Sequence, residues 1–483
     1  MSEPAPSVPA LNDRTVDAPH RHELRTPGYD RAALEPAVVH FGVGGFHRAH
    51  QAVYFDELAE LGFTRWGVIG VGMSRPEMGQ VLDAQDNLFT VVQRGGADDS
   101  AARVIGCVTE YLLLTEDRQE VAERLADPRT RLVTLTVTAD GYVLPPDPQE
   151  ADRSVFGLVV DALDARRRAR RAPFTVLSCD NLPDSAAATR EAVMTLAGRR
   201  GPALARWIAE RVSFPGSMVD RITPATTPGD RDEVEDTFQV GDRWPVITEP
   251  FTQWVIEDDF CNDRPPLDRV GVLFVDDVAP YKLIKSRLLN GVHCALGYVG
   301  HLAGHHRTDE AMADPAVAGF VERLMREEIA PLLPADVPGM DPTAYCGTVL
   351  ERLRNPSIGD PLARLCRRGS TKVPDYLLPS LHDAHAQDSP RARLDLAVAA
   401  WMRYLRAVDL DGRPIDVQDA RAEELRDAAL RGGDDPRPLL ALTDVFGDLA
   451  TDDADVAVIH RSLADAFDSR GSLRSALASP PGV

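Results

Sequence analysis

The stretch Ala37-Val38-Val39-His40-Phe41-Gly42-Val43-Gly44-Gly45-Phe46-His47-Arg48-Ala49-His50 decides how this chain folds. Its first five residues are typical of a short buried strand, and a glycine-dense turn follows at once. Such a turn, between a strand and a helix, lets backbone N–H groups approach a pyrophosphate at the positive end of the helix. The third position of the usual G-x-G-x-x-G/A pattern is His47, so a tight turn without a ligand is the alternative. The stretch predicts a dinucleotide-binding loop.

Short apolar runs alternate with helical patterns beyond this loop, at residues 66–71, 132–137 and 174–178. This alternation is typical of a mainly parallel sheet with crossover helices. After Pro280 the pattern turns helical, over residues 281–304, 315–332, 393–407, 416–430 and 453–467. The sequence therefore predicts an α/β fold, with an N-terminal Rossmann-type domain over 37–280 and a mainly α-helical C-terminal domain over 281–470. We expect a poorly ordered Pro-rich leader over 1–36 and a frayed tail over 471–483.

Composition narrows the class of protein. A chain of 483 residues with 44% apolar content is long enough for two packed domains. The formal charge of −22 argues against nucleic acid or an anionic membrane as partner. Six scattered cysteines without a C-x-x-C pair, no signal-peptide pattern and no long apolar run predict a reduced, cytoplasmic protein that does not span a membrane.

A second informative stretch is Lys285-Ser286-Arg287-Leu288-Leu289-Asn290-Gly291-Val292-His293. On a regular α-helix, Lys285 at 0°, His293 at about 80° and Asn290 at about 140° share one face. A lysine that can lose its proton, an amide and an imidazole suit an oxygen that gains and loses negative charge, as in oxidation of an alcohol. The alternative is a solvated face with a buried structural histidine.

Five blocks together resemble the mannitol dehydrogenase family, the polyol-specific long-chain dehydrogenases and uronate reductases. They are Phe41–Gln51, Asp180–Asp184, Val219–Pro224, Thr248–Phe251 and the Lys285 stretch, in family order and spanning residues 37 to about 380. The resemblance implies an NAD(P)-dependent, metal-independent secondary-alcohol dehydrogenase. It further implies interconversion of a polyol and its ketose, with mannitol and fructose first, and arabinitol and xylulose next. A monomer is the expected state, because family members are often monomeric.

The resemblance also assigns roles to residues. Lys285 matches the general base, Asn290 and Asn181 match amides that hold the substrate oxygen, His293 matches a residue that supports this oxygen, and Asp220 matches its orienting carboxylate. Substrate hydroxyls would be bound by Arg364 and Lys372. The cofactor would be bound by Gly42, Gly44, Gly45, Phe46, His47 and Arg48 in the turn, and by Glu77. Each position also has a structural alternative: a turn at Asn181, an Asp220–Arg221 pair, and solvated charge at Arg364 and Lys372.

Cofactor choice depends on an acid beyond the second strand, because a carboxylate there holds the ribose 2′-hydroxyl and repels a 2′-phosphate. After Gly70-Val71-Gly72 the candidates are Glu77 and Asp86, and we expect Glu77 and NAD. Arg75 lies close to Glu77 and would favour NADP instead.

Two positions depart from the family. Lys282 stands one turn before Lys285, where many mannitol-oxidising members carry Glu, and a cation there suits a substrate carboxylate. Fructuronate-like and tagaturonate-like keto acids are therefore alternative substrates. Ala139 stands where Glu often occurs, and the sequence gives no consequence for it.

Two other designs compete with a metal-independent dehydrogenase. His301 and His305 are four residues apart on a predicted helix, followed by His306, and this spacing can place two imidazoles on one metal. No Cys or carboxylate partner is obvious nearby, so we predict no metal. A nucleotide-sensing binding module would need the glycine turn without the reactive Lys285, Asn290 and His293.

Overall fold

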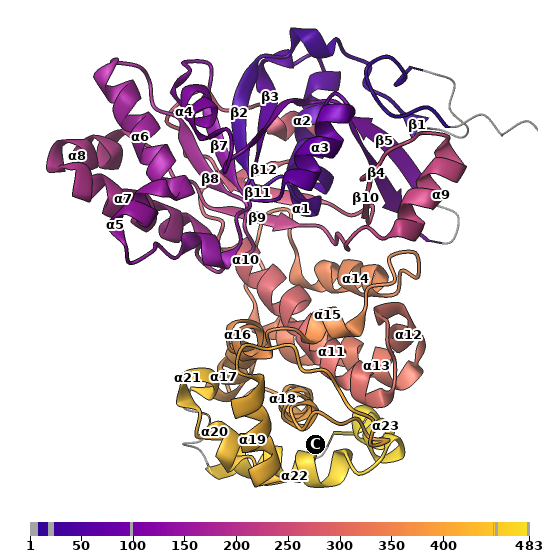
Figure 1. Ribbon diagram of the computed structural model, residues 1–483. Helices are drawn as coiled ribbons and strands as arrows, with labels where there is room; N and C mark the ends of the chain where they lie inside the picture. The colour runs from indigo at the N-terminus through magenta and orange to yellow at the C-terminus, as the bar shows by residue number, and fades with distance from the viewer. Residues whose placement is uncertain (1–7, 18–23, 97–99, 448, 450–452, 481–483) are drawn as a thin grey trace, which may run out of the picture. The chain divides into compact units, whose positions relative to one another are not determined.

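The computed structural model describes residues 8–17, 24–96, 100–447, 449 and 453–480. The chain divides into two compact units, Met1–Val278 and Ala279–Val483 (Figure 1). Residues 1–7, 18–23 and 481–483, which belong to the predicted leader and tail, lie outside the described residues.

The first unit is built around a five-stranded parallel sheet. Its strands are β2 (Pro36–Phe41), β3 (Gly67–Gly72), β6 (Val108–Leu113), β7 (Leu132–Leu135) and β8 (Thr175–Ser178). Their order is β6-β3-β2-β7-β8, and every neighbouring pair is parallel. The α/β prediction is confirmed, and each predicted apolar run of this region forms a strand. Because the chain adds β3 and β6 on one side of β2 and then β7 and β8 on the other, the sheet reverses its order between β2 and β7, which is where such folds bind ligands.

Both faces of this sheet are covered, which explains why its strands are apolar without alternation. Val38 belongs to one buried cluster, with Phe55 and Trp254, whereas its neighbour Val39 belongs to another, with Phe156. Figure 1 shows α2 on one side of the sheet and α4 and α6 on the other. The helices of this unit are α1 (Gly45–Ala49), α2 (Gln51–Glu60), α3 (Pro76–Ala84), α4 (Arg118–Ala126), α5 (Pro148–Arg153), α6 (Val155–Arg168), α7 (Ser185–Arg200), α8 (Pro202–Arg211) and α9 (Pro228–Phe238), with short 3-10 turns η1 (Arg31–Ala33), η2 (Thr64–Trp66), η3 (Ala139–Tyr142) and η4 (Leu267–Val270).

Two smaller sheets complete the unit. One has the order β1-β5-β4-β10 and the other β12-β11-β9, and both mix parallel and antiparallel pairs. Their strands are β1 (Leu24–Arg25), β4 (Phe89–Arg94), β5 (Ser100–Ile105), β9 (Ser217–Asp220), β10 (Val246–Thr248), β11 (Gln253–Glu257) and β12 (Leu273–Val275). The described part of the leader differs from the prediction of poor order, because Leu11 and Val16 pack into a buried cluster with Phe238.

The second unit is helical, as predicted. Its α-helices are α10 (Ala279–Lys285), α11 (Val292–Ala303), α12 (Thr308–Ala313), α13 (Pro315–Arg323), α14 (Pro342–Leu353), α15 (Leu362–Cys366), α16 (Gly369–Lys372), α17 (Leu378–Ala386), α18 (Ala392–Tyr404), α19 (Ala422–Gly432), α20 (Arg437–Leu440), α21 (Thr443–Phe446), α22 (Asp453–Ala466) and α23 (Arg470–Ala478). It also contains the π-helical segments η5 (Ser286–Gly291), η6 (Leu324–Ile329) and η8 (Val373–Leu377) and the 3-10 turn η7 (Ala330–Leu332). Helix α11 is apolar nearly all round and packs against α15 and α18.

The expected frayed tail is wrong for residues 471–478. They belong to α23, which begins at the N-cap Ser469 and buries Leu473 and Leu477 completely. The side chain of Ser469 accepts a hydrogen bond from the N–H of Ser472, which satisfies one of the unpaired donors of the first turn. Within the described ranges, no helix is both long and apolar enough to cross a bilayer.

A buried cluster of charges links α18, α22 and η6. Glu328 accepts hydrogen bonds from the backbone N–H groups of Arg393 and Leu394 at the start of α18. Arg391 forms ion pairs with Asp395 and Asp455. Burial raises the pKa of Asp395 to about 7, although the Arg391 guanidinium opposes the shift. The native state therefore keeps a proton on Asp395 that the unfolded chain releases at lower pH.

This difference in proton uptake predicts a pH-dependent stability. Between about pH 4 and 7 the native state holds the extra proton, so the stability of the unaltered protein should fall as pH rises through this window. Asp395→Asn removes the titration. Relative to the unaltered protein, the variant should gain on the order of 1 kcal/mol or more between pH 4.5 and 8, measured by urea denaturation. Asp427→Asn, on the exposed face of α19, is the control and should show no such gain. A parallel pH dependence in D395N and the unaltered protein would contradict the prediction.

Candidate active site

The glycine turn after β2 has a backbone that only glycine accepts at its first position. Gly42 has φ +99°, and its N–H donates to the carbonyl of Val71 at 2.8 Å. A Cβ added at Gly42 would lie 2.1 Å from the carbonyl oxygen of Thr136, just beyond β7. The Thr136 hydroxyl and the Gly44 N–H both donate to the Gly42 carbonyl, each at 2.7 Å. The turn is therefore fastened to the strands on both sides of β2.

His40 supports the turn from beneath. Its Nε2 lies 3.2 Å from the Gly42 carbonyl oxygen, and its Nδ1 lies 2.7 Å from the Thr134 hydroxyl. Because a carbonyl only accepts, Nε2 carries the proton and Nδ1 accepts from Thr134. The His47 ring stacks on His40, with centroids 3.4 Å apart. Burial lowers the pKa of His40 to about 3 and that of His47 well below its usual range, so both rings are neutral under the turn.

The predicted cofactor-binding residues of the turn differ in exposure. Gly44 is exposed, and Gly42, Gly45 and Phe46 are half-buried. By contrast, His47 and Arg48 are each 1% exposed. Arg48 donates to the carbonyl of Trp244, and its guanidinium lies 5.4 Å from the centroid of the Phe89 ring. The side chains of His47 and Arg48 thus pack inward, and any contact they make with a dinucleotide passes through the backbone.

Glu77 and Asp86 lie at opposite ends of α3. Glu77 is exposed in the first turn of this helix, five residues after Gly72, the last residue of β3. Asp86 follows the end of α3 and accepts a hydrogen bond from the N–H of Asp13. Because α3 starts at the carboxyl end of β3 and runs back along the sheet, only Glu77 lies on the edge that carries the glycine turn.

Asn181 and Asp220 also follow strands of the first unit. Asn181 is exposed in the loop between β8 and α7, and Asp220, 2% exposed, ends β9. The neighbouring Arg221 donates hydrogen bonds to carbonyl oxygens: to that of Glu249 at 3.1 and 2.9 Å and to that of Ala49 at 2.6 Å. Arg221 thus ties the end of α1 to the segment after β10, rather than serving only as a counter-ion for Asp220.

In the second unit, Lys285 ends α10 and is 7% exposed. The expectation of one regular α-helix over 281–304 is wrong at this point, because Ser286–Gly291 form the π-helical segment η5. A π-helix bonds residue i to i+5, so the chain turns through a smaller angle per residue. The offset of Asn290 from Lys285 is therefore smaller than the 140° of a regular helix, and the two lie one π turn apart. Single π turns inside α-helices are frequent at functional sites.

A second π-helical segment, η8, follows Lys372 and packs against η5. The approach is close: a Cβ on Gly291 would lie 2.6 Å from the carbonyl oxygen of Tyr376. η8, which begins directly after Lys372, also packs against α11. The structure therefore brings Lys372 into the neighbourhood of the Lys285–His293 segment.

Lys372 contacts α15, the helix that carries Arg364. The Lys372 ammonium donates to the carbonyls of Leu365 at 3.2 Å and Arg364 at 3.5 Å. Arg364 forms a two-point ion pair with Asp360. Burial lowers the pKa of Lys372. The pKa of Arg364 is raised, because the hydrogen bonds that Arg364 makes to Asp360 outweigh the effect of its burial. Arg364 is thus not merely a solvated surface charge.

One sequence signal was overlooked. The chain contains 53 lysines and arginines, but only Lys282, Lys285 and Lys372 are lysines. All three lie in the second unit, and two of them are the predicted base and a predicted substrate-binding residue. A guanidinium does not deprotonate in proteins, whereas an ammonium does so when desolvated. Because nearly all other cationic side chains of this protein are arginines, each lysine indicates a position where the chemistry of an ammonium group is needed.

The histidines of the metal alternative make other contacts. His305 lies 3.3 Å from a carboxylate oxygen of Asp314, and the His301 ring packs edge-on against Tyr404 at 5.5 Å between centroids. Among the residues that the structure describes, no group of three or more His, Cys, Asp and Glu side chains is placed to share a metal ion. All six cysteines are unpaired.

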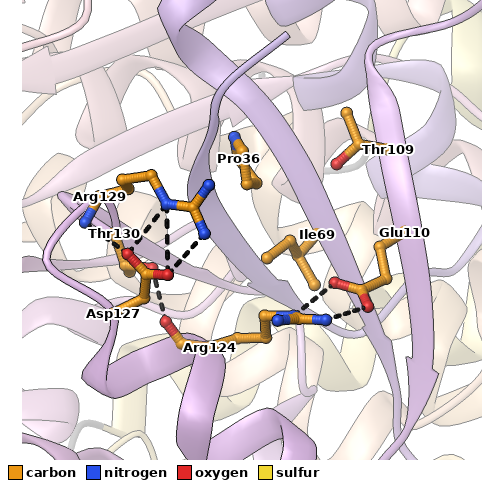
Figure 2. A pocket seen from close by; sticks show the side chains of 8 residues that line it. All are labelled: Pro36, Ile69, Thr109, Glu110, Arg124, Asp127, Arg129 and Thr130. Carbon is orange, nitrogen blue, oxygen red and sulfur yellow. Dashed lines mark hydrogen bonds and ion pairs between the residues drawn. The ribbon is translucent and has the colours of Figure 1, made fainter. Parts of the chain in front are cut away.

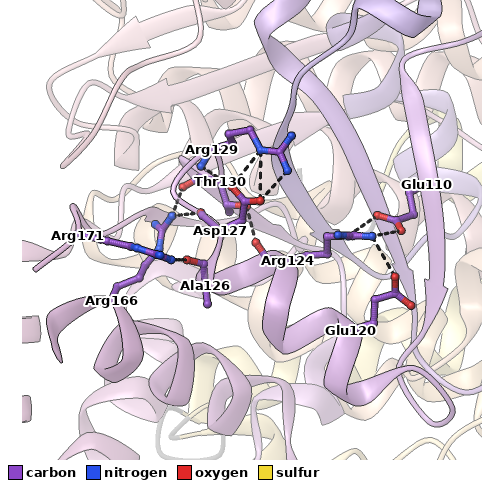
Figure 3. Close-up of polar contacts among 9 residues, drawn as sticks. All are labelled: Glu110, Glu120, Arg124, Ala126, Asp127, Arg129, Thr130, Arg166 and Arg171. Carbon is purple, nitrogen blue, oxygen red and sulfur yellow. Dashed lines mark hydrogen bonds and ion pairs between the residues drawn. The ribbon is translucent and has the colours of Figure 1, made fainter. Parts of the chain in front are cut away.

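A cavity of about 300 Å³ lies at the amino ends of the strands, away from the glycine turn. Figure 2 shows Pro36, Glu110 and Thr130 among its lining residues. Its cations are already paired: Arg124 makes two 2.7 Å bonds to Glu110, and Arg129 binds Asp127. Figure 3 shows that these contacts extend to neighbouring Glu and Arg side chains. The paired charges, and the position on the opposite edge, make this cavity a poor candidate for the dinucleotide.

Comparisons with known proteins cover nearly the whole chain. The model of the mannitol dehydrogenase Rossmann domain matches residues 36–269, and that of the mannitol dehydrogenase C-terminal domain matches residues 277–466. The mannitol 2-dehydrogenase of Neosartorya fischeri is 42% identical over 450 residues, which are 88% of this chain and 89% of the relative. That of Aspergillus clavatus is 40% identical over 484 residues, with coverages of 94% and 96%.

Two solved structures are also similar along their whole length. The Pseudomonas fluorescens mannitol 2-dehydrogenase, in a ternary complex with NAD and D-mannitol, gives a TM-score of 0.86 at 37% identity and covers 98% of this chain and 100% of its own. A D-sorbitol dehydrogenase in substrate-free form gives 0.85 at 29% identity, with coverages of 97% and 98%.

The geometry of Gly42 predicts that its replacement is costly. Gly42→Ala places a methyl group against the Thr136 carbonyl and forces a side chain into a left-handed backbone, so we expect a loss of about 2 kcal/mol or more in the free energy of unfolding. Gly198→Ala is the matched control: it lies in α7 with nothing within 4 Å of the added Cβ, and we expect it to stabilise by about 0.5 kcal/mol. Chemical denaturation measures both, and equal stabilities would contradict the prediction.

The contact between η5 and η8 can be tested in the same way. Gly291→Ala forces the Tyr376 carbonyl away, and because the contact is with backbone, we expect a fall of several degrees in melting temperature, or about 1–3 kcal/mol. Gly347→Ala, in α14, approaches only the tip of Arg326 at 4.0 Å and should leave the melting temperature unchanged or raised. A G291A protein as stable as G347A would show that the two π-helical segments separate without cost.

Proposed function

Because this chain belongs to the mannitol dehydrogenase family, we propose that it is an NAD-dependent oxidoreductase that interconverts a polyol and its ketose. Mannitol and fructose are the first pair, and arabinitol and xylulose the next. The observation that carries this proposal is Lys285, a nearly buried amine that begins the π turn bearing Asn290. The name of the similar P. fluorescens enzyme and its complex with NAD and D-mannitol support the same choice of substrate.

The residues of the glycine turn fit a dinucleotide. Gly44 is exposed, and a Cβ there would meet no atom nearer than 3.9 Å, so the space above the turn is open. The first N–H groups of α1 have no acceptor within the helix and are available to a pyrophosphate. Glu77 on the same edge suits a free ribose 2′-hydroxyl and therefore NAD, whereas the nearby Arg75 keeps NADP as the alternative. When bound, NAD supplies the hydride acceptor.

The chain's own residues would manage the proton and the oxygen. Burial disfavours the charged form of an amine, so the Nζ of Lys285 is suited to take the proton of the alcohol hydroxyl and to return it in ketose reduction. We assign Asn290 and Asn181 to the binding of the substrate oxygen, on which negative charge grows, as the family resemblance implies. We assign His293 to the support of this oxygen and Asp220 to the orientation of the histidine, as the family resemblance implies.

Arg364 and Lys372 are our candidates for binding the other hydroxyls of the substrate. Of the three N–H groups of the Lys372 ammonium, two donate to the carbonyls of Arg364 and Leu365, which leaves one for a ligand. The pair with Asp360 fixes the guanidinium of Arg364. This arrangement suits neutral, hydroxyl-rich ligands, since part of the cationic charge is already compensated.

A uronate reductase is the second candidate. Lys282 lies one turn before Lys285 on α10 and is half-buried, and a cation there suits a keto acid. A binding module without catalysis remains the alternative of another class. We further propose a monomer in the cytoplasm that needs no metal, in keeping with its unpaired cysteines.

A substrate screen tests the proposed function. The unaltered protein is assayed for NADH and NADPH oxidation at 340 nm with fructose, xylulose, fructuronate and tagaturonate. The proposal expects the highest kcat/KM with NADH and fructose. A preference for fructuronate or tagaturonate would replace the polyol proposal with the uronate one. No turnover with any of the four, together with intact NADH binding, would favour the binding module. A rate abolished by chelation and restored by Zn²⁺ would overturn metal independence.

The role of Lys285 gives a sharper prediction. Lys285→Ala should lower kcat by about 10²–10⁴-fold, the usual contribution of a general base, while the Kd for NADH stays within twofold. Lys285→Arg is the matched control, because it keeps a cation of similar length that cannot release its proton. If Lys285 acts as a base, K285R is as inactive as K285A; if it acts only through its charge, K285R retains most of the activity. Full activity in K285A would end the assignment.

A further inference from the structure

The loop after β7 contains a residue in a backbone conformation that is almost confined to glycine. Thr138 has φ 65° and ψ 167°, and its side chain is exposed. Such residues persist only where the surroundings determine the conformation, and they gather at ligand-binding sites. Thr138 lies two residues beyond Thr136, whose carbonyl meets Gly42. The strained residue therefore stands on the carboxyl edge of the sheet, at the reversal of strand order between β2 and β7.

The carboxylate of Asp180 imposes this conformation. One of its oxygens accepts from the N–H of Thr138 at 2.9 Å, and the other accepts from the N–H of Val137 at 2.9 Å and from the Tyr142 hydroxyl at 2.8 Å. The Tyr142 hydroxyl in turn lies 2.6 Å from the hydroxyl of Ser178, the last residue of β8. Burial raises the pKa of Asp180, whereas its three donors stabilise the charged form. A carboxylate at the end of β8 thus fixes the backbone that leaves β7, its neighbour in Figure 1.

We call Asp180 and the backbone of Val137 and Thr138 that it holds the Asp180 clamp. Its position in the sheet indicates which part of a dinucleotide it would contact. In doubly wound folds the ribose-binding acid after the second strand marks the adenosine half, and the pyrophosphate crosses at the glycine turn. Here the acid is Glu77 after β3, and the turn follows β2. The nicotinamide half then extends to the other side of the reversal, over the ends of β7 and β8. That is where Val137, Thr138 and Asp180 lie.

We propose that Asp180 is a positioning residue for the nicotinamide half of the cofactor, acting through the backbone of Val137 and Thr138 that its carboxylate holds in place. The inference deepens the proposed function and rests on its dinucleotide site. Asn181 follows Asp180 directly, so the same anchor fixes the start of the segment that carries the proposed oxygen-binding amide. Asp180 belongs to a block that the sequence indicated, but neither Asp180 nor Tyr142 was among the candidate site residues.

Asp180→Asn tests the proposal with little change in shape. The amide replaces one acceptor oxygen by a donor, which faces the N–H of Thr138 in one orientation and both the N–H of Val137 and the Tyr142 hydroxyl in the other. We expect the Kd for NADH, measured by fluorescence titration, to rise at least tenfold. The Kd for ADP, which carries only the adenine half, should stay within twofold. Asp184→Asn is the control: Asp184 lies in the same loop and caps α7, a position that Asn also fills well, so both affinities should be unchanged.

A rescue experiment separates positioning from general loss of structure. Glycine adopts the Thr138 conformation without strain, so Thr138→Gly in the D180N background should recover most of the lost NADH affinity, and Thr138→Gly alone should bind NADH normally. Equal weakening of NADH and ADP binding, or no recovery in the double variant, would overturn the inference. If D180N does not fold, Tyr142→Phe removes one of the three donors, and unchanged NADH affinity in Y142F would overturn it instead.

These readouts are independent of the proposed reaction. The effect of the Asp180 clamp is measured as a change in nucleotide affinity, whereas the polyol activity is measured by turnover of the unaltered protein. An unaltered protein that binds NADH but does not turn over polyols or ketoses would reject the proposed reaction and leave the test of Asp180 intact. An unaltered protein that does not bind NADH would overturn both.

Discussion

The close approach of Gly42 to the Thr136 carbonyl is the constraint on which the dinucleotide-binding unit depends. A side chain at residue 42 would occupy the space that this carbonyl fills. Because the contact joins the ends of β2 and β7, it fixes the two strands between which the sheet reverses its order. The neutral His40 and His47 rings, stacked beneath the turn, then support it without a charge that would have to be solvated.

The same principle, close approach of backbone, operates in the helical unit. Gly291 lets η5 pack against the Tyr376 carbonyl of η8, and both π-helical segments follow a functional lysine candidate. A π turn inserts one residue into a helix and so changes the direction in which the following side chains point. Lys285 precedes the insertion and Asn290 lies within it. The angular relation between these two side chains is therefore a product of packing between segments far apart in the sequence.

These particulars explain which features the sequence could predict. The strands of the parallel sheet were predictable because burial on both faces demands continuous apolar runs, such as Val38-Val39. The glycine turn was predictable because its glycines directly follow an apolar strand in a known pattern, although the carbonyl that leaves no room for a side chain at residue 42 belongs to the distant Thr136. The π turn was not, since the 3.6-residue period of the leucines around it is compatible with a regular helix, and the sequence does not reveal the distant Tyr376 backbone against which the turn packs. Leu11 and Leu473 were likewise assigned to disordered ends, because composition does not reveal the partners that bury them.

The candidate site residues also divide into those with a local sequence signal and those whose role depends on contacts with distant residues. Lys285 and Asn181 could be proposed from the sequence because their chemistry is distinctive and their motifs resemble a family. Asp180 stands beside Asn181 in the same motif, yet its role comes from hydrogen bonds to residues some forty positions earlier, Val137 and Thr138. A residue that acts by holding another segment carries no local signature.

The scarcity of lysine has a chemical consequence of its own. Primary amines condense with carbonyl compounds to form Schiff bases, and open-chain sugars are carbonyl compounds. Guanidinium groups, always protonated, do not react in this way. With arginine in all but three of its 53 cationic side chains, this protein presents very few ε-amines on which a reducing sugar could form an adduct. The side-chain amines at which a ketose could form such an adduct are therefore those of Lys282, Lys285 and Lys372.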